Sequence, residues 1–290
     1  EGVDLIWDWL TDLRPTVADA PAPMVPIRVD TTAPQETAVV ELGGAGGQIT
    51  FGALDRRVEG LARGLHARGV RRGHRVALLV KPGIDLTSVL YAVWRLGAVA
   101  VVADAGLGLR RMGAALRSAD PQHVIGFPAA RAIVASARVP GQWIRLGSED
   151  VAALIADGAS HDLPADGLLS PTAELDLDGA VLFTSGATGP PKGVVYTRRQ
   201  IGAQVALLRD TFGFRPGERF VAAFAPFALY GPALGLASAV PDMDVTAPDT
   251  LTAGALADAV EAIGATVVFA SPAALENVVA TANDLTAGQL

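Results

Sequence analysis

LFTSGATGPPKGVVYTRRQ fills residues 182–200, and the interpretation of the whole chain starts from it. An apolar, strand-like run ends near Phe183, a helical pattern begins near Thr197, and a loop of glycine, hydroxyl and proline residues separates them. Glycines let backbone N–H groups turn toward one point and let a bulky anion approach, while hydroxyls add donors without charge. The loop ends at Lys192, one of only two lysines among 23 basic residues, and an ammonium group can follow phosphate oxygens. The stretch therefore predicts a strand–loop–helix unit whose loop binds a polyphosphate.

The loop is not a Walker A motif, because Lys192 follows Pro191 and precedes Gly193 where that motif requires Gly-Lys-Ser/Thr. It resembles instead the phosphate loop of the adenylate-forming superfamily, which includes acyl-CoA synthetases, nonribosomal peptide adenylation domains and firefly luciferase. That consensus reads [Ser/Thr]-Ser-Gly-[Ser/Thr]-Thr-Gly-x-Pro-Lys-Gly, and Ala187 in place of a hydroxyl residue is the one departure. The matching positions are Thr184, Ser185, Gly186, Ala187, Thr188, Gly189, Pro190, Pro191, Lys192 and Gly193.

Strand-like and helix-like segments alternate along most of the chain, which is typical of an α/β fold with parallel sheets. VALLV at 76–80 is a continuous apolar run, as expected for a strand covered on both faces. The resemblance implies the large N-terminal domain of the adenylate-forming fold, truncated. We expect an irregular segment with a short helix over 1–37, a first α/β sub-lobe over 38–157, a linker or surface loop over 158–178, and a second sub-lobe over 179–290.

Composition excludes several classes of function. The net charge is −7, the pI is about 5.1 and no basic stripe is present, so nucleic-acid binding is not expected. The chain has no cysteine, and its four histidines are scattered, which disfavours a metal site of the zinc type. The apolar run at 86–103 contains Arg95 and Gly97, so it reads as a buried helix and strand rather than a membrane span, and we expect a cytoplasmic protein.

The resemblance implies a reaction in which ATP and a carboxylic acid give acyl-AMP and pyrophosphate. It assigns catalysis to Lys192, Thr184 and Thr188, and nucleotide binding to Thr184, Ser185, Gly186, Ala187, Thr188, Gly189, Lys192 and Gly193. Mg²⁺ would bridge the phosphates near Thr188. PFALYGPALG at 226–235 occupies the place of an aromatic-His motif in many members, with Ala228 where the histidine would stand. The acyl group is expected along Phe227, Ala228, Tyr230 and Gly231.

PFALYGPALG together with PDMDVT at 241–246 resembles the branch of olefin β-lactone synthetases, which act on β-hydroxy fatty acids. The two aspartates of PDMDVT favour a surface turn over a metal site. Three alternatives stay open. A fatty acyl-CoA synthetase would use CoA as a further substrate, a non-catalytic nucleotide- or acyl-binding module would have kept only the fold, and a dehydrogenase is disfavoured because no Gly-x-Gly-x-x-Gly joins a strand to a helix.

The chain starts at Glu1 rather than Met, and residues 284–290 read as the start of a helix. The later motifs of the superfamily, including its ribose-binding aspartate and the lysine of its small C-terminal domain, have no counterpart. We therefore expect a piece of a longer protein that does not complete adenylation alone. A homodimer is left open, since a cut edge would expose apolar surface.

Overall fold

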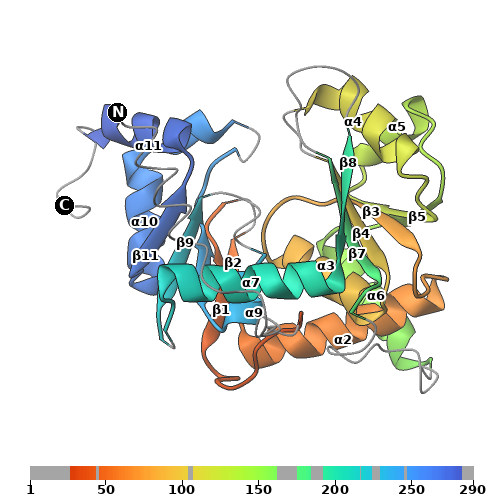
Figure 1. The fold of residues 1–290 in the computed structure, drawn as a ribbon, viewed down its shortest axis with the longest axis horizontal. Coiled ribbons are helices and arrows are strands. Elements are labelled where there is room, and N and C mark those ends of the chain that lie inside the picture. The colour runs from red at the N-terminus through yellow and green to blue at the C-terminus, as the bar shows by residue number, and fades with distance from the viewer. Residues whose placement is uncertain are drawn as a thin grey trace, which may run out of the picture.

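The structure, a computed structural model, describes residues 27–43, 46–103, 107–161, 175–183, 192–215, 217–223, 229–244 and 247–282. The short helix expected near the N-terminus lies outside these residues. The described chain forms two sheets flanked by helices (Figure 1), which confirms the predicted α/β class with parallel sheets. Among the described residues, no helix has both the length and the apolarity needed to cross a bilayer.

The first sheet, called sheet B, has six strands in the order β6-β5-β3-β4-β7-β8. All its neighbours are parallel except β7 and β8, which form an antiparallel pair at one edge. The central strands are almost fully buried, which explains their continuous apolar sequence. The strands are β3 (Arg75–Leu79), β4 (Val99–Ala103), β5 (His123–Gly126), β6 (Gln142–Arg145), β7 (Asp178–Phe183) and β8 (Gly193–Thr197).

The second sheet, sheet A, has five strands in the order β11-β9-β10-β1-β2. It is parallel except for the antiparallel pair of β1 and β2 at its edge. Its strands are β1 (Thr37–Glu41), β2 (Gly47–Thr50), β9 (Arg219–Ala223), β10 (Ala237–Val240) and β11 (Val267–Ala270).

Helices cover both sheets and fill the space between them. Figure 1 shows α2 along the lower side, α3 between the sheets and α10 with α11 outside sheet A. The largest apolar cluster draws buried side chains from strands of both sheets, so the two sheets share one core. The helical segments are α2 (Phe51–Ala67), α3 (Ile84–Arg95), α4 (Gly108–Ser118), α5 (Ala130–Ser136), α6 (Ser148–Ala159), α7 (Arg198–Phe212), α9 (Gly231–Leu234), the 3₁₀ turn Pro248–Thr250, α10 (Ala253–Ile263) and α11 (Pro272–Ala280).

Neither sheet is built only from strands on one side of 158–178, the segment for which the sequence predicts a linker or a surface loop. Strand β1 pairs with β10, with Val39 opposite Ser238, and so joins sheet A. Strand β7 pairs with β4, with Val101 opposite Val181, and so joins sheet B. Each sheet therefore combines early and late strands. The sequence could not predict this, because hydrophobic periodicity indicates where strands occur but not which strands pair.

Candidate functional site

The predicted phosphate loop connects the two antiparallel strands at the edge of sheet B. Phe183 pairs with Gly193, so the last residue of β7 and the first of β8 are neighbours across the ladder. Phe183 also stands beside Ala103 at the carboxyl end of β4. The carboxyl ends of parallel strands are where open α/β sheets bind their ligands. The loop residues Thr184, Ser185, Gly186, Ala187, Thr188, Gly189, Pro190 and Pro191 lie outside the described residues.

Strand β8 itself was missed by the sequence analysis, which ran the loop directly into the helix. Val194, Val195 and Tyr196 have the β-branched and aromatic character of a strand. Five residues beside a glycine-rich loop give too short a pattern to separate from loop. The strand matters because it returns the chain along β7 and closes the loop as a hairpin.

Gly193 is required at this closure by packing. A Cβ atom at Gly193 would lie 2.8 Å from Cζ of Phe183 and 3.0 Å from Cγ1 of Val181. Contacts below 3.0 Å force a neighbour to move, and both neighbours belong to the buried face of β7. Lys192 directly precedes Gly193 and is exposed. The structure thus holds the predicted lysine at the mouth of the hairpin, next to the loop.

Helix α7 begins as predicted, immediately after the hairpin. The Thr197 hydroxyl accepts a hydrogen bond from the Gln200 backbone N–H at 3.2 Å, and the Gln200 side-chain oxygen accepts from the Thr197 N–H at 2.8 Å. Such a reciprocal cap stabilises a helix start by about 1 kcal/mol. The next residue, Arg198, is buried, and its Nη1 donates to the Trp94 backbone oxygen at 3.0 Å near the end of α3. Arg198 therefore links the start of α7, directly after the hairpin, to α3.

On the acid side, the structure describes Tyr230 and Gly231, whereas Phe227 and Ala228 lie outside the described residues. Tyr230 is the N-cap of α9, and its hydroxyl donates to Oε1 of Gln204 on α7 at 2.8 Å. Burial raises the pKa of Tyr230, so the neutral hydroxyl is favoured. A Cβ atom at Gly231 would lie 2.0 Å from Oγ of Ser238 on β10. Only glycine allows α9 to pack this closely against the sheet.

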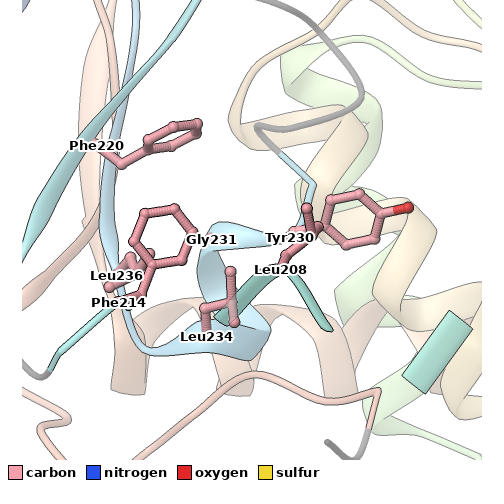
Figure 2. Close-up of a pocket in the computed structure, with 7 residues that line it drawn as sticks. All are labelled: Leu208, Phe214, Phe220, Tyr230, Gly231, Leu234 and Leu236. Atoms are coloured by element: carbon pink, nitrogen blue, oxygen red, sulfur yellow. The ribbon is translucent and has the colours of Figure 1, made fainter. Parts of the chain in front are cut away.

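A small apolar cavity adjoins these two residues. Figure 2 shows the Phe214 and Phe220 rings on one side and Tyr230 on the other, with the Tyr230 hydroxyl directed away. The volume is about 10 Å³, room for roughly one water. That is far below the several hundred Å³ typical of ligand pockets, so the cavity as described does not hold an acyl chain. It is lined by Leu208, Phe214, Phe220, Tyr230, Gly231, Leu234 and Leu236.

Sequence reasoning missed Leu208, Phe214, Phe220, Leu234 and Leu236 as neighbours of Tyr230. Phe214 and Phe220 form an edge-on pair with centroids 6.2 Å apart. The aromatic spacing in FGFRPGERF, residues 212–220, is the one signal that could have indicated them. Among the described residues, no group of three or more His, Cys, Asp or Glu side chains could hold a metal ion. Thr188, the expected neighbour of Mg²⁺, lies outside them.

The hairpin loop, its lysine and its position at the carboxyl end of a parallel sheet fit an anionic nucleotide tail. Comparison with known proteins agrees: the profile described as "AMP-binding enzyme" matches residues 28–289. This chain belongs to the AMP-binding enzyme family. It is 38% identical over 234 residues to an olefin beta-lactone synthetase from Xanthomonas campestris pv. campestris, covering 78% of this chain and 41% of that protein. It is 35% identical over 172 residues to a feruloyl-CoA synthase from an Amycolatopsis species, covering 59% of this chain and 32% of that protein.

A solved structure has the same fold. The N-terminal domain of FACL13 from Mycobacterium tuberculosis superposes with a TM-score of 0.70 at 22% identity, covering 86% of this chain and 62% of that one. The two sheets and their helices are thus those of an AMP-binding N-terminal domain. The chain spans about two fifths of the length of the β-lactone synthetase that it matches.

Proposed function

We propose that this chain supplies the phosphate-binding half of an enzyme that adenylates a β-hydroxy fatty acid, with ATP as co-substrate and pyrophosphate as the leaving group. The observation that carries the proposal is the loop from Thr184 to Gly193, whose ends meet at the Phe183–Gly193 pair beside the carboxyl end of β4. Membership of the AMP-binding family supports ATP as the nucleotide.

In this reaction a carboxylate oxygen attacks the α-phosphorus, and negative charge moves onto the departing pyrophosphate. The backbone N–H groups of the glycine-rich loop, with the hydroxyls of Thr184, Ser185 and Thr188, donate to the β- and γ-phosphate oxygens. Lys192 places a positive charge at the same oxygens. Donors fixed before the reaction stabilise developing charge without reorganisation, which is commonly the largest catalytic effect. Mg²⁺, when bound near Thr188, would add charge neutralisation at the phosphates.

The acid is assigned by similarity to the β-lactone synthetases and by the apolar surroundings of Tyr230. We place its reacting end toward the loop and its hydrocarbon part along Phe227, Ala228, Tyr230 and Gly231. The small cavity behind Tyr230 would then lie next to the chain rather than contain it.

A fatty acyl-CoA synthetase is the second candidate, and the likeness to a feruloyl-CoA synthase, which acts on an aromatic acid, supports only its use of CoA. The two readings share the adenylation step and differ in the acceptor that follows. Under the lactone reading, AMP is released without any thiol, because the substrate's own β-hydroxyl closes the ring. A strict requirement for CoA in AMP release would select the synthetase.

The test is fatty-acid-dependent exchange of pyrophosphate into ATP, measured on the full-length protein and on this chain alone. Lys192→Ala should lower exchange by about 100-fold or more, the scale on which a lost charge-stabilising donor acts. The matched control is Lys81→Ala, because Lys81 is the other lysine and is also exposed. Exchange that needs no acid, or that survives in Lys192→Ala, would contradict the proposal.

A further inference from the structure

Helix α3 occupies a central place between the two halves of the candidate site. Nine consecutive residues, Leu86 to Trp94, are buried, so the helix is enclosed on all sides over that length. It contacts β1 of sheet A and β3 and β4 of sheet B (Figure 1). Polar groups in such an enclosed helix are costly unless they are hydrogen-bonded. Two of its aromatic side chains carry a polar atom, and each donates to a backbone oxygen of a different segment: one just before α9, the other in strand β7 of the hairpin.

Tyr91 reaches the acid side. Its hydroxyl donates to the backbone oxygen of Leu229 at 2.8 Å, directly before Tyr230 and α9. Burial raises the pKa of Tyr91, and a hydrogen bond with the Ala233 backbone opposes that shift. The hydroxyl therefore holds the residue directly before the α9 cap. The two residues are 138 positions apart in sequence, so the contact is a tertiary one that no local sequence pattern predicts.

Trp94 reaches strand β7 of the hairpin, at the end of that strand opposite the phosphate loop. Its indole Nε1 donates to the backbone oxygen of Gly179 at 2.8 Å. The β7–β8 register shifts between Asp178 and Ala180, which leaves Gly179 as the extra residue of a bulge. The indole thus satisfies a carbonyl at the irregular point of the hairpin ladder. A Cβ atom at Gly179 would lie 2.7 Å from Ile201 on α7, so α3, β7 and α7 meet at this glycine.

The two side chains also touch each other. The Tyr91 and Trp94 rings pack edge to face with centroids 5.4 Å apart. They are three positions apart, which places them on the same side of the helix. Arg198, the first residue of α7, donates to the Trp94 backbone oxygen and so adds a second link from α3 to the hairpin.

We propose that Tyr91 and Trp94 are positioning residues that set the acid-binding segment and the phosphate hairpin, respectively, against one shared helix. The inference rests on the proposed function for the meaning of the two sides. In this proposal Tyr91 holds Leu229, and through it the segment along which the substrate acid lies. Trp94 anchors the hairpin that carries the phosphate loop through Gly179, at the end of β7 opposite that loop. Neither side chain is assigned contact with substrate.

Amide hydrogen exchange on this chain tests the positioning itself, without any activity. Tyr91→Phe should speed exchange about tenfold in peptides covering 229–236 and leave peptides of β7 and β8 within twofold of the parent, because a buried carbonyl loses its donor locally. Trp94→Phe should give the reverse pattern. The control is Thr87→Val, which removes a buried hydrogen bond of 2.9 Å from the Thr87 hydroxyl to the backbone oxygen of Gly83 at the start of α3. It should leave both sets of peptides unchanged.

Urea unfolding of each variant separates a local effect from a global one. Equal acceleration of both sets of peptides in both variants, scaling with the loss of overall stability, would overturn the proposal. The opposed pattern would support it.

The second measurement is a KM comparison in the pyrophosphate exchange assay on the full-length protein. Tyr91→Phe should raise the KM for the acid about three- to tenfold and leave the KM for ATP within twofold, and Trp94→Phe should do the opposite. Equal changes in both KM values in each variant would overturn the division of roles. If the parent protein shows no acid-dependent exchange, the proposed function fails, and the hydrogen-exchange contrast still decides the positioning.

Discussion

Sheet B and sheet A share a plan but differ in how well they are covered. Each is a parallel sheet with one antiparallel edge strand. Among the described residues, the strands of sheet B contribute to the two largest apolar clusters, whereas the β9, β10 and β11 part of sheet A packs in three small ones. Within the described residues β11 pairs with β9 alone, and Val268 on it is 42% exposed. We infer that sheet B and the central helix form the stable part, and that the outer part of sheet A opens at lower cost.

The largest expected loss of stability is at the glycine contact between α2 and α6, which pack outside sheet B. A Cβ atom at Gly64 would lie 2.1 Å from the backbone oxygen of Leu154. Backbone cannot yield as a side-chain tip can, so Gly64→Ala should lower the free energy of unfolding by about 3 kcal/mol in urea titrations.

The matched control is Gly264→Ala, at the C-cap of α10 beside sheet A. Gly264 has φ of +57°, but the atoms nearest to its Cβ position are side-chain atoms of Arg219, at 3.5 Å or more. The expected loss is about 1 kcal/mol, from the left-handed backbone alone. Equal losses in the two variants would contradict the difference in packing.

The next largest effect compares one valine in each sheet. Val101 on β4 is fully buried and Val268 on β11 is 42% exposed. Val101→Ala should cost about 2 kcal/mol through lost burial and a residual cavity, whereas Val268→Ala should cost about 0.5 kcal/mol or less. Both changes in the free energy of unfolding are measured from the shift of the urea midpoint, provided that the m-value is the same in parent and variant. A cost for Val268→Ala as large as that for Val101→Ala would mean that β11 is covered in solution.

Part of this contrast was readable from the sequence. The buried strands of sheet B appear as apolar runs such as VALLV, and the loop that ends in Lys192 and Gly193 matches a dense motif. The pairing of β1 with β10 was not readable, because strand patterns carry no information on partners. Nor were the demands on Gly64 and Gly193, since both arise from side chains or backbone that approach from elsewhere in the fold. The contacts of Tyr91 and Trp94 could not be predicted from the sequence either, because an apolar helix pattern does not show which buried residue donates to which distant carbonyl.

A smaller effect, dependent on pH, belongs to the amino-terminal edge of sheet B. His74 Nδ1 and His123 Nε2 are 3.2 Å apart, and the rings stack with centroids 5.3 Å apart. Burial lowers the pKa of His123, and the charge of His74 and then of Arg71 lowers it further. The folded state thus binds protons less readily than the unfolded state. The contribution of His123 to the free energy of unfolding is complete above its unfolded-state pKa, near 6.5. It is lost as the pH falls from that value toward the lower folded-state pKa, by at most about 1.4 kcal/mol per pH unit.

The measurement is urea unfolding between pH 7.5 and 5 for the parent and for His123→Leu. The variant should show a shallower loss of stability on acidification, because the titrating group and its repulsion are gone. An identical pH profile in both proteins would remove His123 from the account of acid sensitivity. His161→Leu serves as the control, since His161 is exposed just after the C-terminal end of α6.

The smallest effect has the opposite sign and lies where sheet A meets α3. Glu41, the last residue of β1, is half-buried, and its carboxylate accepts from the Ile84 N–H at 3.1 Å in the first turn of α3. Burial raises the pKa of Glu41, the Ile84 hydrogen bond opposes the shift, and the charge of Asp85 raises the pKa further while that of Arg57 lowers it. Because the folded pKa is raised, this group favours the folded state at low pH and loses that contribution as the pH rises through the folded value. Glu41→Gln keeps an acceptor for Ile84 and should change stability by about 0.5 kcal/mol or less at pH 7, whereas Glu41→Ala should cost about 1 kcal/mol through the lost helix cap. If Glu41→Gln were as damaging as Glu41→Ala in urea unfolding, the carboxylate charge rather than the hydrogen bond would join sheet A to α3.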